Sequence, residues 1–166
     1  MTNELLPRFQ AVGFDLYSRG MVSVHGGNLS VRQGEKAVIT RSGSKLGYLT
    51  GTDLIETGVD QDDDNTRLAS SELAVHRAIY KQAPFQAIVH CHPIHAVALS
   101  FTRRAIHPED EGGKIFIPEV PVIAFGREPA PGGFADEIAE ALKTHAVVIV
   151  HQIGRASCRE RVSSPV

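Results

Sequence analysis

The sequence is poor in cysteine and has no long hydrophobic run. Its 166 residues include only two cysteines, Cys91 and Cys158, which is too few for the disulfide framework of a small secreted domain. No apolar stretch approaches the length of a membrane span, and the N-terminus lacks the hydrophobic segment of a signal peptide. These features predict a cytoplasmic protein that does not enter a membrane.

An excess of positive charge is also missing. Seventeen Lys and Arg face 19 Asp and Glu, so the formal net charge is -2. That balance gives no electrostatic reason to expect binding to nucleic acid or to an anionic membrane surface. With 42% hydrophobic and 22% charged residues, the chain has the composition of one globular domain with a substantial core.

Hydrophobic periodicity predicts helices and strands that alternate irregularly along the chain. The expected helices cover residues 5–17, 52–56, 71–81, 94–101 and 134–143. The expected strands cover residues 29–31, 37–40, 87–90, 120–124 and 146–150, and Pro121 suggests that the fourth is an edge strand. Because no regular βαβ period is present, we expect an α/β layered fold with a central, largely antiparallel sheet flanked by helices.

Two histidines mark the end of the apolar run 87–89. His90 and His92 are two residues apart, so on a strand their side chains would point to the same side, with Cα atoms roughly 6.5 Å apart. Two imidazoles placed in this way can converge on one divalent metal ion. The alternative is a strand end whose histidines hold no ligand.

Three turns rich in glycine and serine precede this pair. Glycine lets backbone N–H groups approach an anion closely, serine and asparagine add donors, and a helix N-terminus adds a positive dipole end. Each turn alone is more often a plain turn or helix cap, but together they predict a phosphate pocket made from Gly27, Asn28, Ser42, Gly43, Ser70 and Ser71.

Glu72 is the candidate acid/base, because it ends the third of these turns, Ser70–Glu72, and lies in the first turn of the predicted helix. Its alternative role is to stabilise the helix dipole from the first turn. His76 and His95 are interpreted as core or supporting residues, and His25 gives no usable signal.

These motifs, in this order, resemble the class II aldolase/adducin family, and most closely its fuculose-1-phosphate aldolase type. The resemblance rests on Gly27–Ser30, Thr40–Gly43, Ser70–Glu72 and His90–Pro93, and it extends from Leu5 to His151. It implies Zn²⁺ on His90 and His92, although another divalent metal is possible. It also implies catalysis by Glu72, a small phosphorylated sugar as substrate, and a homotetramer with the active site at a subunit boundary.

The resemblance also implies a third histidine ligand after the last strand, and here the sequence departs from the family pattern. His151 is the nearest candidate, one residue earlier than expected, and position 152 could have been histidine in the natural gene. Residues 153–162 correspond to one reading frame of a common sequencing adapter; an ordinary basic tail is the alternative. We therefore expect a family domain over residues 1–152 that is incomplete at its C-terminus. Residues 153–166 would be a non-native tail that packs against little.

The implied reaction is zinc-dependent cleavage of a ketose-1-phosphate to dihydroxyacetone phosphate and an aldehyde. Three alternatives remain open within the family: a pentulose-phosphate 4-epimerase, a thiosugar-phosphate dehydratase and a non-enzymatic adducin-like scaffold. Glu72 favours aldolase over epimerase, since the epimerases typically carry aspartate there. The two histidines argue against the scaffold.

Overall fold

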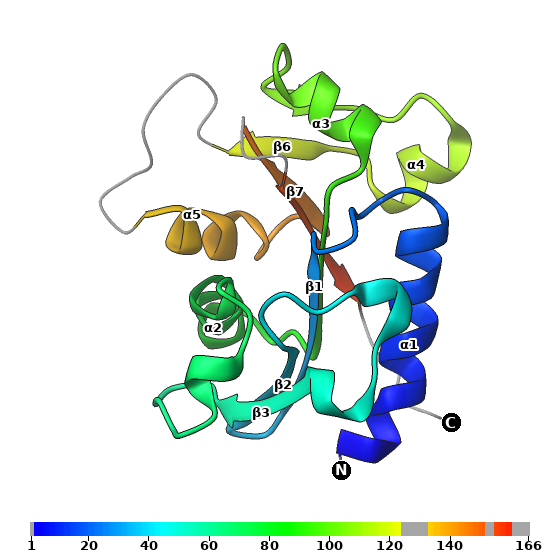
Figure 1. The fold of residues 1–166 in the computed structure, drawn as a ribbon. Coiled ribbons are helices and arrows are strands. Elements are labelled where there is room, and N and C mark those ends of the chain that lie inside the picture. The colour runs from blue at the N-terminus through cyan, green and yellow to red at the C-terminus, as the bar shows by residue number, and fades with distance from the viewer. Residues whose placement is uncertain (1, 124–132, 152–154, 161–166) are drawn as a thin grey trace, which may run out of the picture.

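A mixed α/β domain is built around one sheet in the computed structural model, which describes residues 2–123, 133–151 and 155–160 (Figure 1). Its strands are β1 Asn28–Gln33, β2 Lys36–Thr40, β3 Leu54–Gly58, β4 Ala87–Cys91, β5 Ala105–Ile106, β6 Val120–Ile123, β7 Val147–Val150 and β8 Arg155–Glu160. The helices are α1 Thr2–Ser18, α2 Leu73–Gln82, α3 Ile94–Ser100, α4 Glu111–Phe116 and α5 Gly133–Ala141, with single 3₁₀ turns at Leu46–Tyr48, Gly51–Asp53 and Thr66–Leu68.

The strand order is β3-β2-β1-β4-β8-β7-β6-β5, and every pair is antiparallel except β6 with β7. The largely antiparallel sheet flanked by helices confirms the predicted fold class. None of the helices in the described ranges is long and apolar enough to cross a membrane.

Alternate residues of the strands cover two different cores. Leu29 and Cys91 pack with α1 through Phe9, while Ile88 on the opposite face packs with Tyr80 of α2. Figure 1 accordingly shows α1 on one side of β1 and α2 with α5 on the other. The side chains of β1 and β4 that face α2 therefore include His90 and Asn28, which lie opposite each other in the register of the two strands.

The predicted helix at residues 52–56 is wrong. Only Gly51–Asp53 is helical, as one 3₁₀ turn closed by reciprocal hydrogen bonds between Thr50 and Asp53. Leu54 and Ile55 are extended instead, because Ile55 pairs with Ile39 of β2 and both side chains are buried. Tertiary pairing outweighs the local helical pattern here.

Two expectations about the C-terminal part also need correction. β6 is not an edge strand, because the two-residue β5 pairs with it through Pro121 and Val120. The backbone of β8 pairs with β4 and with β7, so the expected lack of contacts is wrong for residues 155–160. A strand here supplies partners for the backbone groups that two neighbouring strands would otherwise leave unpaired. Residues 152–154 and 161–166 lie outside the described residues, and the domain boundary at residue 152 stays a prediction.

Candidate active site

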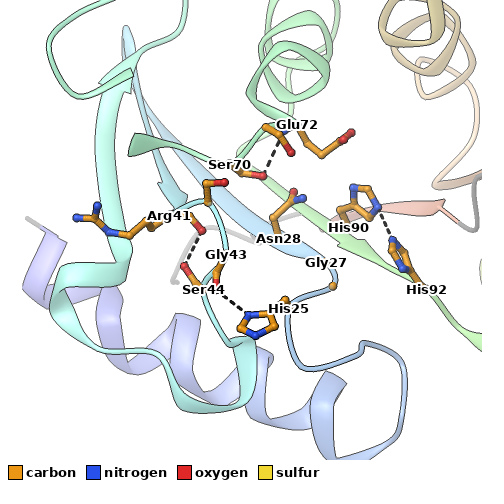
Figure 2. Close-up of a pocket in the computed structure, with 13 residues that line it drawn as sticks. His25, Gly27, Asn28, Arg41, Gly43, Ser44, Ser70, Glu72, His90 and His92 are labelled. Carbon is orange, nitrogen blue, oxygen red and sulfur yellow. Dashed lines mark hydrogen bonds between the residues drawn. The ribbon is translucent and has the colours of Figure 1, made fainter. Parts of the chain in front are cut away.

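One cavity of about 200 Å³ brings together nine of the ten residues that the sequence singled out. The exception is His151. The cavity lies where the loop before β1, the turn after β2, the start of α2 and the end of β4 meet (Figure 2). Its lining is His25, Gly26, Gly27, Asn28, Arg41, Ser42, Gly43, Ser44, Ser70, Ser71, Glu72, His90 and His92.

The two histidines meet at one wall of this cavity. The Nε2 atoms of His90 and His92 are 3.0 Å apart, and their ring centroids are separated by 5.1 Å. His90 is buried in β4, while His92 lies just past the strand, where its backbone N–H donates to the carbonyl of Met21. The shared direction predicted from the spacing is therefore present.

This arrangement fits half of a tetrahedral metal site. Two nitrogen ligands at the usual zinc bond length of about 2.0–2.1 Å lie roughly 3.3 Å apart across a tetrahedral angle. The observed 3.0 Å needs only a small ring adjustment to reach that spacing. Among the described residues, no group of three His, Cys, Asp or Glu side chains is close enough to complete a metal site.

Glu72 stands at the start of α2, beside Ser70 and on the side of the cavity that holds His90 and Asn28 (Figure 2). The sequence placed Ser70 or Ser71 at the N-cap, but Glu72 is the N-cap residue and makes no side-chain capping bond. Ser70 instead accepts the backbone N–H of Glu72 at 3.3 Å and is itself buried. The half-buried Glu72 side chain thus reaches the cavity from the positive end of a helix dipole.

Glycine is required where the loop before β1 passes the histidine strand. Gly27 has φ 78°, and a Cβ there would lie 2.7 Å from the carbonyl oxygen of His90 and 2.7 Å from the side chain of Val22. Gly43 also has a positive φ, of 76°, but faces open space. The first position therefore needs glycine for both conformation and close approach, and the second for conformation alone.

Asn28, which lines the cavity, carries a buried amide oxygen. The residue is 5% exposed, and its Oδ1 has no hydrogen-bond partner among the residues that the structure describes. Leaving such an atom unpaired costs about 1–3 kcal/mol. A ligand hydroxyl or a water molecule that donates to Asn28 would recover that cost.

The sequence gave no role to two titratable residues that line the cavity. The Nδ1 atom of His25 lies 3.0 Å from the carbonyl oxygen of Gly43, which connects two of the turns. Arg41 also lines the cavity, but its guanidinium points away from it (Figure 2) and donates from Nε to the carbonyl of Thr52. Both residues lie within turns that the sequence singled out, His25 at the start of the first and Arg41 in the second, and this position was the available signal.

Two further histidines lie outside the cavity lining, the half-buried His151 and the buried His76. His151 follows β7, where its N–H donates to the carbonyl of Ile123 at 2.9 Å and its ring lies 6.3 Å from that of Phe101. His76 is 1% exposed on α2, and burial lowers its pKa to about 3. Its Nδ1 lies 2.6 Å from the hydroxyl of Ser30.

Comparison with known proteins agrees with this picture. The sequence profile described as "Class II Aldolase and Adducin N-terminal domain" matches residues 8–163. The chain therefore belongs to the class II aldolase and adducin family.

A solved structure of L-fuculose-1-phosphate aldolase from Thermus thermophilus is similar to this chain with a TM-score of 0.88 and 36% identity. The match covers 99% of this chain and 84% of that one. An L-fuculose phosphate aldolase from Methanocaldococcus jannaschii is 33% identical over 140 residues, which is 80% of this chain and 76% of that protein.

A second activity occurs among the relatives. A probable bifunctional methylthioribose-1-phosphate isomerase/methylthioribulose-1-phosphate dehydratase from Nocardia farcinica is 36% identical over 96 residues. That match covers 56% of this chain but only 17% of the relative, so the chain spans about one sixth of that protein's length.

Proposed function

We propose that the chain forms the catalytic domain of a metal-dependent aldolase that cleaves a ketose-1-phosphate to dihydroxyacetone phosphate and an aldehyde. One observation carries the proposal: the histidine pair, Glu72 and three turns rich in donors open into the same cavity. The two L-fuculose phosphate aldolases among the relatives support a substrate of the fuculose-1-phosphate kind.

His90 and His92 are the proposed metal ligands, and their Nε2 separation of 3.0 Å supports this role. A Zn²⁺ ion there would supply Lewis-acid chemistry, stabilising negative charge on substrate oxygen atoms. His151 remains the candidate for the third ligand. Its ring packs on Phe101, which lines an apolar hollow together with His92.

The glycine and serine turns are the proposed phosphate pocket. Gly27, Ser42, Gly43, Ser70 and Ser71 offer backbone N–H and hydroxyl donors. Binding the phosphate away from the reacting carbons supplies energy that holds those carbons in place. Asn28, with its unpaired oxygen, suits a hydroxyl of the same substrate better than the phosphate, because a dianionic phosphate has no proton to donate.

Glu72 is the proposed acid/base. When the bond between C3 and C4 breaks, the C4 hydroxyl loses its proton and becomes the carbonyl of the aldehyde. The electron pair left on C3 must take up a proton to give dihydroxyacetone phosphate. A carboxyl group held at the cavity wall beside His90 can deliver that proton and can remove it in the reverse direction.

A homotetramer is part of the proposal. The hollow lined by His92, Ile94, Val97, Ala98 and Phe101 adjoins the cavity, and the side chains of Ile94 and Phe101 are 70% and 53% exposed. Apolar exposure beside the metal ligands suits a contact with another subunit at that place.

Dehydration of methylthioribulose-1-phosphate is the second candidate, favoured by the Nocardia relative. Both reactions use a phosphorylated ketose, so the cavity geometry suits either. Incubation with each substrate separates them. We expect zinc-dependent release of dihydroxyacetone phosphate from fuculose-1-phosphate, measured with a coupled reductase. Turnover of methylthioribulose-1-phosphate alone would replace the aldolase proposal with the dehydratase.

A further inference from the structure

A buried cluster of three polar side chains lies directly behind the cavity. The hydroxyl of Ser30 is 2.6 Å from Nδ1 of His76 and 2.6 Å from the hydroxyl of Tyr80. These three residues are 2%, 1% and 1% exposed. None of them lines the cavity, so the proposed reaction gives them no direct role.

The order of protons in this cluster follows from its partners. Within the described ranges, Ser30 is the only side chain hydrogen-bonded to the hydroxyl of Tyr80. The arrangement that leaves no buried proton unpaired therefore has Tyr80 donating to Ser30. The proton of Ser30 is then available for Nδ1 of His76, which accepts if the imidazole is neutral with its own proton on Nε2. Burial raises the pKa of Tyr80 and lowers that of His76, so both residues keep these neutral forms near pH 7.

The cluster joins the two elements that carry the proposed chemistry. Ser30 lies two residues after Asn28 on β1, so both side chains face α2, and Asn28 pairs with His90 of the next strand. His76 lies one turn after Glu72, and its backbone N–H donates to the Glu72 carbonyl at 3.2 Å. A hydrogen bond from Ser30 to His76 therefore connects the strands that hold Asn28 and His90 with the first turn that holds Glu72.

Other directional bonds also hold α2, since Arg77 donates to the carbonyl of Gly58 and Arg32 of β1 donates to the carbonyl of Tyr80. The bond between Ser30 and His76 is the one nearest to Glu72, one helical turn away, and the remaining contacts of this part of the helix are apolar. Leu73 packs against Ile39 and Ile55, and Ile79 packs in the core beside Ile88. Apolar packing is non-directional and tolerates small sliding and rotation of a helix, whereas a 2.6 Å hydrogen bond restricts both. A shift of about 1 Å at a reacting group can cost roughly 100-fold in rate.

We propose that the Ser30–His76–Tyr80 cluster is a positioning network that sets the distance of Glu72 from His90 and Asn28. The effect of this network on kcat rests on the proposed function, but its effect on the position of Glu72 does not. Ser30 and His76 act through Glu72 and touch no substrate.

The test compares Ser30→Ala with Thr57→Val in the full chain. Thr57 is a matched control, because its hydroxyl is equally buried and also bonds to two side chains, those of Asp63 and Thr66, away from the cavity. Amide hydrogen exchange is measured at Leu73, Val75 and His76, whose N–H groups bond to the backbone of residues 70–72. We expect at least tenfold faster exchange in Ser30→Ala and no change at these amides in Thr57→Val.

Turnover supplies the second reading. For the ketose-1-phosphate we expect kcat to fall roughly 10- to 100-fold in Ser30→Ala, with KM unchanged within about twofold and partial rescue by Ser30→Thr. Unchanged exchange in Ser30→Ala, or equal losses of kcat in Ser30→Ala and Thr57→Val, would overturn the network. Absence of turnover in the unsubstituted protein would instead overturn the proposed function, and the exchange rates would still decide whether the network positions Glu72.

Discussion

The two halves of the sheet differ in what they carry. The half made of β3, β2, β1 and β4, together with the start of α2, supplies every residue that lines the cavity. The half made of β8, β7, β6 and β5 supplies none of that lining, yet it contains His151. In the function proposed above, binding and proton transfer are therefore built within the first 92 residues, and the second half contributes the candidate third ligand.

Removing the histidine pair should give the largest effect. We expect His90→Ala with His92→Ala to lower zinc affinity more than roughly 100-fold relative to the unsubstituted protein. His151→Ala in the second half should cost less, because His151 does not line the cavity. Zinc content is measured after dialysis in the double variant, in His151→Ala and in the unsubstituted protein. His107→Ala, which changes an exposed histidine, is the control. An unchanged zinc content in the double variant would show that His90 and His92 are not metal ligands.

Glu72→Gln should lower kcat by about 10²–10⁴-fold, because the amide cannot transfer the proton. Zinc content and phosphate affinity should stay near those of the unsubstituted protein, since the side chain keeps its shape. Steady-state kinetics with fuculose-1-phosphate measure the change. Turnover within a few fold of normal would exclude Glu72 from the mechanism.

Two glycine substitutions sharpen the comparison within the first half. Gly34 has φ 63° and faces open space. Gly34→Ala should therefore lower the free energy of unfolding only by the conformational strain, about 1–2 kcal/mol. Gly27→Ala carries the same strain, and its methyl group would also lie 2.7 Å from the His90 carbonyl and from Val22. This overlap should lower the free energy of unfolding by a further ~1–3 kcal/mol. Urea unfolding measures both. Only Gly27→Ala should also weaken zinc and phosphate binding, because its methyl group displaces His90; equal effects of the two substitutions would show that the close approach is unimportant.

The smallest effect is a pH dependence of stability from His76. Its folded pKa of about 3 lies below the ordinary value of 6.5, so between these values the unfolded chain binds more protons than the folded one. The free energy of unfolding should therefore fall as the pH drops below 6.5, by roughly 1 kcal/mol per pH unit from this residue. His76→Gln should flatten the profile from pH 6 to 4. An identical slope in both proteins would show that His76 is not held neutral.

The motifs predicted the first half of the molecule well because their constraints are local. A two-residue spacing places His90 and His92 on one side of a strand whatever surrounds it. Gly27 is required because the backbone passes close to the carbonyl of His90. The sequence could not reveal that β1 and β4 are neighbours, which is what brings Asn28 opposite His90. It also gave no role to His25 and Arg41, two residues that line the cavity once the turns are folded.

Prediction failed where tertiary pairing decides the structure. Residues 54–58 are extended because they pair with β2, although their sequence also suits a short helix. β6 lies inside the sheet because a two-residue strand, too short to recognise, covers its outer side. The pairing of residues 155–160 between β4 and β7 likewise depends on two strands far away in the sequence.

The central claim is that the first half of the sheet forms a site for a phosphorylated ketose. Calorimetric titration of the zinc-loaded protein with fuculose-1-phosphate and with free fuculose tests it most directly. We predict that the phosphorylated sugar binds at least roughly 100-fold more tightly, because charge-assisted hydrogen bonds to the phosphate come from the turns that carry Gly27, Gly43 and Ser70. Equal affinity for the two sugars would contradict the account.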